Sequence, residues 1–355
     1  MSGKRRGVSV FRTLGSLIFA GAVAVGLLYL GDMVLKRMFN ATAMSMPYYI
    51  VFALVALAVF VLMVFPANRP GRSIKNFLRW LLIIVLSLGI AVGGIVWNLQ
   101  NEMMYQTAHY DAADEAKVKA MAGMEEITVS DRARQTYHGW LWKNAPDRAG
   151  LVIYFGGNGE FAASSMSSIA GTAQAGQLFN GYNVLMVDNP GYGQSQGQPG
   201  DDNIYRMALA VWDHMAARPD VDPQRIVLAG WSLGTGPAAR LAAEKEPAGL
   251  VLMAPFYDGR ELINGVMDAN ILPNFLEFLV RNKYQNKLYA RETEAKTLVI
   301  GAKNDRMIPV EQAQRLAKEY PNGTYLEVDG SHSDARFGPN ALMAIAQFLQ
   351  QAAVK

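Results

Sequence analysis

The stretch RIVLAGWSLGTGPAAR, residues 225–240, joins an apolar run to a helix-forming run through a glycine-rich turn. Its apolar half is continuous, as in a strand that is buried on both faces of a sheet. The turn GWSLG places Ser232 between Gly230 and Gly234. A serine in such a strand-to-helix turn takes a strained backbone conformation, and side chains at the flanking positions would collide with neighbouring backbone. The stretch therefore predicts a nucleophilic serine, with a helix dipole where an oxyanion develops.

The same alternation of apolar runs and helical stretches continues on both sides of this turn. Five further apolar runs begin at residues 151, 183, 249, 297 and 324. Helical patterns lie between them, at residues 204–217, 237–246 and 310–320. Continuous strands that alternate with helices predict a doubly wound, mostly parallel sheet of the α/β class. Residues 127–129 and 139–142 predict an antiparallel hairpin at its edge.

Composition excludes several classes of protein. The chain has 355 residues, a net charge of +3 and no cysteine. Its basic residues gather at the N-terminus and in one short loop, which argues against nucleic acid as a partner. The lack of cysteine excludes disulfides, cysteine-ligated zinc and a cysteine nucleophile. The histidines that could act as bases are His109, His138, His214 and His332.

The N-terminal third contains three long apolar segments, at residues 14–34, 47–65 and 77–97. Each has about the length of a helix that crosses the hydrocarbon core of a bilayer. A cleaved signal peptide would have a shorter apolar stretch and no further segments behind it. We therefore expect four consecutive regions: a cytoplasmic N-terminus at 1–13, three transmembrane helices within 14–97, a juxtamembrane linker at 98–122 and a soluble domain at 123–355.

Basic residues predict how these helices are oriented. Those that favour a cytoplasmic N-terminus precede the first segment or join the second to the third: Lys4, Arg5, Arg6, Arg12, Arg69, Arg72 and Lys75. Lys36 and Arg37 oppose this assignment weakly. Because cytoplasmic loops are enriched in Lys and Arg, an odd number of crossings delivers the C-terminal domain to the extracytoplasmic side. The sequence thus predicts an integral, multi-pass membrane protein whose partner is the lipid bilayer.

Four motifs follow one another in the soluble part: YFGGNGE at 154–160, DNPGYGQSQGQP at 188–199, the Ser232 turn, and the pair NDRMIP at 304–309 with GSHSD at 330–334. In this order they resemble the α/β-hydrolase superfamily, and specifically its branch of serine-aminopeptidase-like and lysophospholipase-like hydrolases. The resemblance covers the chain from about residue 125 to its end. It implies a catalytic domain that works without metal or organic cofactor.

The resemblance also implies a catalytic triad in the order serine, aspartate, histidine. Ser232, Asp305 and His332 satisfy that order, and the last two each follow an apolar run, at the strand ends where a doubly wound sheet builds its site. A serine hydroxyl needs an imidazole to take its proton, and the imidazole needs a carboxylate to hold its tautomer. Asp258 follows another strand and is an alternative acid. Asp334 lies too close to His332 in sequence to be the usual orienting residue.

For the oxyanion hole, the superfamily uses the backbone N–H after the nucleophile and one from the loop after the third strand. These map to Leu233 and Asn158. The sequence departs from the family at Gly156, where histidine is usual, and at Pro190, where a basic residue is usual. Neither change removes a backbone donor, but we expect both to make the shape of the acyl pocket differ from that of the family. A nucleotide phosphate loop at FGGNG is disfavoured, because no Gly-Lys-Ser/Thr follows it.

About forty residues separate the strand ending near residue 255 from the next one, and this position usually carries a cap in the superfamily. We expect a short cap at about 257–293, in which the apolar run ILPNFLEFLV at 271–280 lines an acyl pocket, touches the bilayer or forms a buried helix face. The predicted function is a membrane-anchored serine hydrolase that cleaves carboxylic esters or thioesters, with acyl or lipid-like substrates. The alternatives are a serine peptidase of the same fold and a non-catalytic membrane scaffold.

Overall fold

The computed structural model describes residues 100–101, 104–107, 110–172, 174–266 and 280–352, and residues 104–355 form one compact unit. The three apolar segments that predict transmembrane helices lie outside the described residues. Among the described helices, none has both the length and the apolar character that a membrane crossing requires.

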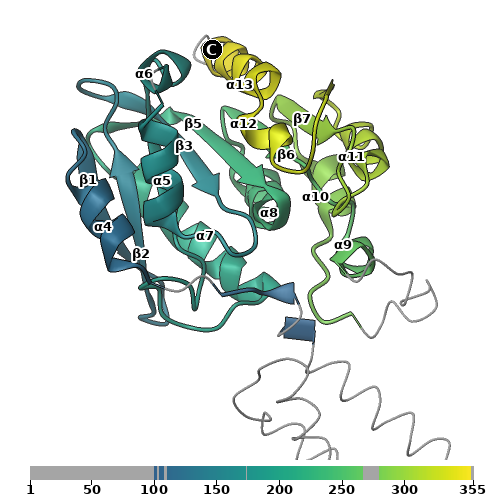
Figure 1. Cartoon of the computed structure of the whole chain (residues 1–355), viewed down its shortest axis with the longest axis horizontal. Helices are drawn as coiled ribbons and strands as arrows, with labels where there is room; N and C mark the ends of the chain where they lie inside the picture. The colour runs from purple at the N-terminus through teal and green to yellow at the C-terminus, as the bar shows by residue number, and fades with distance from the viewer. Residues whose placement is uncertain (1–99, 102–103, 108–109, 173, 267–279, 353–355) are drawn as a thin grey trace, which may run out of the picture. The chain divides into compact units, whose positions relative to one another are not determined.

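The compact unit is built on one sheet of eight strands in the order β1-β2-β4-β3-β5-β6-β7-β8 (Figure 1). The strands are β1 (Met124–Ser130), β2 (Thr136–Trp142), β3 (Ala149–Phe155), β4 (Tyr182–Val187), β5 (Val221–Trp231), β6 (Gly249–Met253), β7 (Thr297–Ala302) and β8 (Gly323–Val328). Strands β4 to β8 and β3 run parallel, whereas β1 pairs antiparallel with β2 and β2 antiparallel with β4. The predicted mostly parallel sheet and the antiparallel edge hairpin are thereby confirmed.

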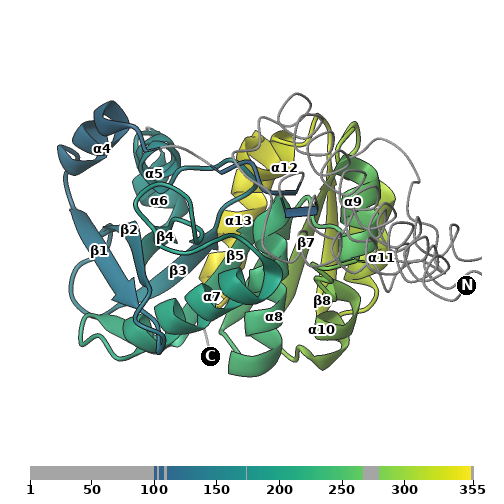
Figure 2. The same cartoon turned by 90° about the horizontal axis from the view of Figure 1, so that it is seen from below.

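Helices cover both faces of this sheet, as Figure 2 shows. One face packs against α4 (Ala112–Lys119), α5 (Ala162–Ala170), α6 (Ala175–Leu178), α12 (Asp334–Phe337) and α13 (Pro339–Ala352). The other packs against α7 (Asp201–Ala216), α8 (Thr235–Lys245), α9 (Gly259–Val266), α10 (Asn286–Glu292) and α11 (Val310–Ala317). Strands β3, β4, β6 and β7 are buried along their whole length, which explains why their sequences are continuously apolar.

The domain begins earlier than the sequence indicates. The predicted juxtamembrane linker spans residues 98–122, yet Met104 and Tyr105 within it are buried in the core and Val118 of α4 is fully buried. The Tyr105 hydroxyl forms a hydrogen bond of 2.8 Å with that of Tyr284. These contacts come from single apolar side chains that alternate with polar ones. Such isolated apolar residues do not distinguish a segment of the domain from a linker in the sequence.

The predicted cap at 257–293 is only partly described. Its two ends form α9 and α10, and α10 packs on α8 and α11 with Ala290 fully buried. The run at 271–279 lies outside the described residues, and Val280 after it is buried. The described ends therefore belong to the helical layer that includes α7 and α8.

A buried aspartate at the end of β4 makes the stability of the domain depend on pH. Asp188 is 1% exposed and accepts a hydrogen bond of 2.7 Å from the Ala162 backbone at the start of α5. Its second oxygen has no hydrogen-bond partner among the described residues. Loss of hydration on burial, opposed by that hydrogen bond and aided by the charge of Glu115, raises the pKa of Asp188 to about 7.

The folded state thus holds the Asp188 proton more tightly than the unfolded chain, whose aspartates titrate near 4. The resulting stabilisation is fully present below about pH 4 and is lost as the pH rises through about 7. Between pH 5 and pH 8 we expect wild-type protein to lose about 3 kcal/mol of unfolding free energy that Asp188→Asn does not lose. Thermal unfolding across this range measures the difference, with Asp202→Asn, an 86% exposed side chain, as the control. Equal pH slopes in wild type and Asp188→Asn would contradict this assignment.

Candidate active site

Ser232 lies at a tight turn between β5 and α8. Strand β5 ends at Trp231, a single turn of 3₁₀ helix spans Ser232–Gly234, and α8 follows. The backbone φ angle of Ser232 is 52°, in the left-handed region that non-glycine residues rarely adopt. A Cβ atom on Gly230 would lie 2.4 Å from the Gly234 carbonyl oxygen, and one on Gly234 would lie 2.0 Å from that of Phe155. The turn that the sequence predicts is therefore formed, and both glycines are required by close backbone contacts.

The loops after β7 and β8 bring Asp305 and His332 together. The Lys303 backbone N–H donates to the Val328 carbonyl at 3.0 Å, and that of Asn304 donates to the Gly330 carbonyl at 2.9 Å. These bonds set the Nδ1 atom of His332 2.6 Å from the Oδ2 atom of Asp305.

The environment of Asp305 fixes its orientation. Its side chain is 1% exposed, and its other oxygen, Oδ1, accepts hydrogen bonds from the backbone of Met307 at 2.8 Å and of Ile308 at 2.9 Å. A carboxylate in this position favours the histidine tautomer that carries its proton on Nδ1. The unprotonated Nε2 atom is then left to act as a base.

His332 also contacts the turn that carries Ser232. Its ring lies 5.0 Å, centroid to centroid, from the ring of Trp231, and the Trp231 indole N–H donates to the His332 carbonyl at 3.3 Å. Nε2 of His332 is buried and has no hydrogen-bond partner within the described part of the chain, so the bond to the Ser232 hydroxyl is not formed here. Catalytic hydrogen bonds are often long without substrate and tighten when it binds.

The other two aspartates considered for this role, Asp258 and Asp334, form contacts that do not involve His332. Asp258 is buried at the start of α9, where one oxygen accepts from the Glu261 backbone and the other forms an ion pair of 2.9 Å with Lys287. Asp334 is partly exposed to solvent and accepts two hydrogen bonds from Ser331, which lower its pKa. The structure therefore joins His332 to Asp305 and directs Asp258 and Asp334 elsewhere.

His138 and His214 are not part of this cluster. His138 on β2 bonds to Glu126 at 2.9 Å through Nε2, and His214 lies in the last turn of α7. His109 lies outside the described residues. Among the described residues, no three histidine, aspartate or glutamate side chains converge as a metal site would require.

The two segments predicted to form an oxyanion hole are in contact. Leu233 follows the nucleophile, and the adjacent Gly234 packs directly on the end of β3, where the loop with Asn158 begins. The Asn158 side-chain oxygen accepts hydrogen bonds from the Gln106 backbone at 2.8 Å and the Tyr192 hydroxyl at 2.9 Å. Burial raises the pKa of Tyr192 well above its usual range, so its hydroxyl keeps the proton that it donates.

Three contacts of the site were not anticipated from the sequence: Trp231 against His332, and Gln106 and Tyr192 on Asn158. Trp231 and Tyr192 lie within the quoted motifs, so their presence near the site could have been inferred, although not their partners. Gln106 lies in the predicted linker, and its identity gives no indication of this contact, because it binds Asn158 through its backbone N–H.

Residues 150–287 match the family model of the α/β-hydrolase fold. An uncharacterized protein of Mycobacterium tuberculosis is 28% identical over 278 residues, which are 76% of this chain and 95% of that protein. The α/β-hydrolase domain-containing protein 17C of mouse is 31% identical over 135 residues, or 38% of this chain and 41% of that one.

Solved structures share the architecture. An esterase of Pyrococcus furiosus superposes with a TM-score of 0.54 at 19% identity, covering 70% of this chain and 97% of that chain. Est1E from Butyrivibrio proteoclasticus superposes with a TM-score of 0.51 at 17% identity, covering 65% of this chain and 99% of that chain. With the sheet order and the family match, these likenesses show that the domain has the α/β-hydrolase fold.

Proposed function

We propose that this protein is a serine hydrolase of carboxylic esters, with Ser232 as nucleophile, His332 as general base and Asp305 as the residue that orients the histidine. The observation that carries the proposal is the 2.6 Å contact between Asp305 and His332 beside a serine held at a positive φ angle. The three residues follow the parallel strands β5, β7 and β8, whose carboxyl ends lie at one edge of the sheet, and this placement supports acyl transfer.

In the proposed reaction, the Ser232 hydroxyl attacks the ester carbonyl while Nε2 of His332 takes its proton. The Asp305 carboxylate stabilises the imidazolium that forms. The negative oxygen of the tetrahedral intermediate would be stabilised by the backbone N–H groups of Leu233 and Asn158. His332 then gives its proton to the leaving alcohol, and water repeats the sequence on the acyl-enzyme to release the acid and restore Ser232.

Acyl or lipid-like esters are the proposed substrates, as in the lysophospholipase-like branch. Support comes from the three apolar segments at 14–34, 47–65 and 77–97 and from the apolar run at 271–280. An enzyme that is anchored to a bilayer encounters such esters at high local concentration. The Pyrococcus furiosus protein that shares the fold is by its name an esterase, and this supports the proposed reaction class. Anchoring, with the domain on the extracytoplasmic side, is part of the same proposal.

The decisive experiment is fluorophosphonate labelling of carbonate-washed membranes that contain the full chain. We expect one labelled band of 38.9 kDa in the pellet, and a membrane-impermeant probe should label it in sealed cells. A panel of acyl esters of rising chain length should then be hydrolysed, with peptide amides cleaved far more slowly. Labelling in the soluble fraction would contradict membrane anchoring. Faster cleavage of amides than of esters would favour a serine peptidase, and absence of labelling would favour a non-catalytic scaffold.

A further inference from the structure

A buried carboxylate follows the glycine-rich loop that carries Asn158. Four donors converge on Glu160, whose side chain is 9% exposed. Oε2 accepts from the Gly157 backbone at 2.5 Å and from the Tyr154 hydroxyl at 3.0 Å. Oε1 accepts from the Ser165 hydroxyl at 2.6 Å and from the Arg336 guanidinium. Both oxygens are thus used as acceptors, which a carboxylate can provide and a neutral amide cannot.

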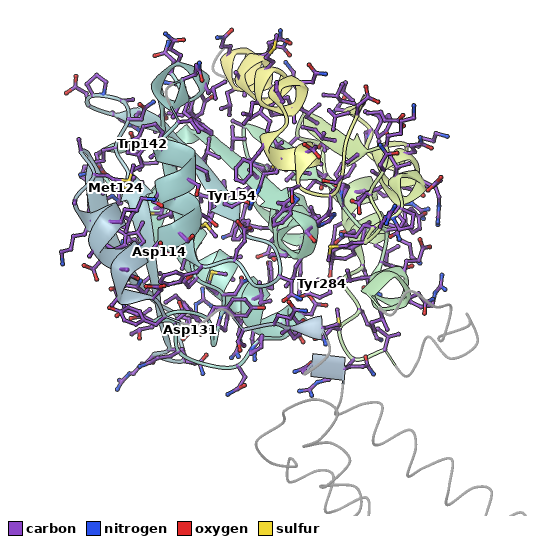
Figure 3. All side chains as sticks on the ribbon, in the orientation of Figure 1. Asp114, Met124, Asp131, Trp142, Tyr154 and Tyr284 are labelled. Carbon is purple, nitrogen blue, oxygen red and sulfur yellow. The ribbon has the colours of Figure 1, made fainter. Side chains whose placement is uncertain are left out.

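Arg336 reaches this carboxylate from the histidine side of the site. It lies on α12, four residues after His332, and its guanidinium also donates to the Tyr154 hydroxyl at 2.9 Å. Figure 3 shows Tyr154 among the side chains of the sheet face that α5 and α12 cover. The guanidinium carbon lies 3.9 Å from the ring centre of Trp231, the residue before the nucleophile. One side chain therefore touches the nucleophile turn and binds the residue that closes the glycine loop.

The tyrosine between them remains a donor at every working pH. Its side chain is buried and its hydroxyl lies beside the Glu160 carboxylate, and both effects hold the pKa of Tyr154 well above its usual range. Tyr154 receives a hydrogen bond from Arg336 and passes one to Glu160, so the three side chains form one chain of polarised hydrogen bonds in a medium of low dielectric.

The loop needs such a restraint because of its composition. Residues 156, 157 and 159 are glycines, which leave the backbone free to adopt many conformations. Electrostatic stabilisation of an oxyanion depends on donors that are held in place before the reaction begins. Gly157 is the only residue of this loop whose N–H donates to Glu160 among the described contacts, and it directly precedes Asn158. The Gly157 carbonyl, which shares a peptide with the Asn158 N–H, accepts a hydrogen bond from the Glu160 backbone N–H at 3.3 Å. Glu160 thus restrains the peptides on both sides of Gly157, through its carboxylate on one side and its backbone on the other.

We propose that Glu160 and Arg336 are positioning residues of the catalytic site, a buried ion pair that holds the oxyanion loop, the Trp231 turn and the His332 loop in one fixed arrangement. The inference rests on the proposed function and deepens it. It assigns a role to a contact between residues that are 176 positions apart in the chain.

The test is the kinetics of Glu160→Gln in the full-length protein, measured per active site after titration with a fluorophosphonate. The glutamine side chain has one oxygen and one NH₂ group, so its NH₂ group must face donors that now bond to a carboxylate oxygen. The glycine loop then loses a restraint. We expect kcat to fall about 100-fold, the scale of losing one oxyanion donor, with little change in KM. Arg336→Lys should also lower kcat per site, and the double variant should lose less than the product of the two, because both act through one contact.

Glu319→Gln provides the matched control. Glu319, in the turn after α11, accepts from the Tyr257 hydroxyl at 2.6 Å and from Arg291 of α10 at 2.8 Å, the same pair of donor types as at Glu160. This variant should lower the unfolding temperature and leave kcat per site unchanged. If Glu160→Gln only lowered the titratable fraction, with wild-type kcat per site, the ion pair would be structural and the inference would be overturned. Failure of the proposed function would differ, because wild-type protein itself would then not titrate at Ser232.

Discussion

Replacing Ser232 with alanine is expected to abolish fluorophosphonate labelling and to lower kcat for ester hydrolysis by about a millionfold, the scale seen when a triad nucleophile is removed. Without the hydroxyl no acyl-enzyme can form, and a water molecule attacking in its place lacks the position that the strained turn provides. The effect should fall on kcat, because the nucleophile acts on the reacting carbonyl and contributes little to holding the substrate.

The fold should survive this change. Ser232 already holds a φ angle of 52°, and alanine meets the same strain there as serine. Thermal unfolding should therefore differ from wild type by no more than about 1 kcal/mol. Ser167→Ala, which removes another buried serine hydroxyl on α5, serves as the matched control and should label fully. Undiminished labelling of Ser232→Ala would place the nucleophile elsewhere and end the assignment.

The mostly parallel class of the sheet could be predicted because burial leaves a direct trace in composition. Strands β3, β4, β6 and β7, and β5 from Ile226 onward, lie between two layers of helices, so these sequences are continuously apolar and the parallel class follows. The turn at Ser232 was equally predictable from the sequence, because close backbone contacts demand glycine at two fixed positions. Strand β8 shows the limit of this signal. It lies at the edge and is partly exposed, and only its short run at 324–328 indicated a strand.

What could not be predicted depends on contacts between distant residues. The motif at 154–160 contains Glu160 but indicates no role for it, and Arg336 lies in none of the motifs. Nothing in the local sequence indicates that α12 packs against the glycine loop. The burial of Tyr105 belongs to the same kind. Its partner Tyr284 is 179 residues away, so the segment before α4 looked like a linker. The order of the motifs predicts that His332 pairs with Asp305, but the distance between the two side chains could be known only from the folded structure.

Changing Asp305 to asparagine tests which carboxylate orients the histidine, and we expect kcat to fall by about ten-thousandfold. The backbone N–H groups of Met307 and Ile308 both point at Oδ1, so the asparagine carbonyl must take that position and its NH₂ group must face His332. Nδ1 of the histidine then has to accept a hydrogen bond, which puts its proton on Nε2. A histidine in that tautomer cannot remove the proton of Ser232.

Asp258→Asn is the contrasting variant, because it removes the ion pair with Lys287, while the asparagine oxygen can still accept the hydrogen bond from the Glu261 backbone N–H. That variant should unfold at a lower temperature while kcat per active site stays near wild type, since no contact joins Asp258 to His332. His332→Ala should lose about as much rate as Ser232→Ala, because nucleophile and base act as a unit. The measurement is kcat for one acyl ester across the variants, each titrated for active sites. If Asp258→Asn were severely impaired and Asp305→Asn mildly, the acid would have to be reassigned to the loop after β6, and the 2.6 Å contact would be a structural one.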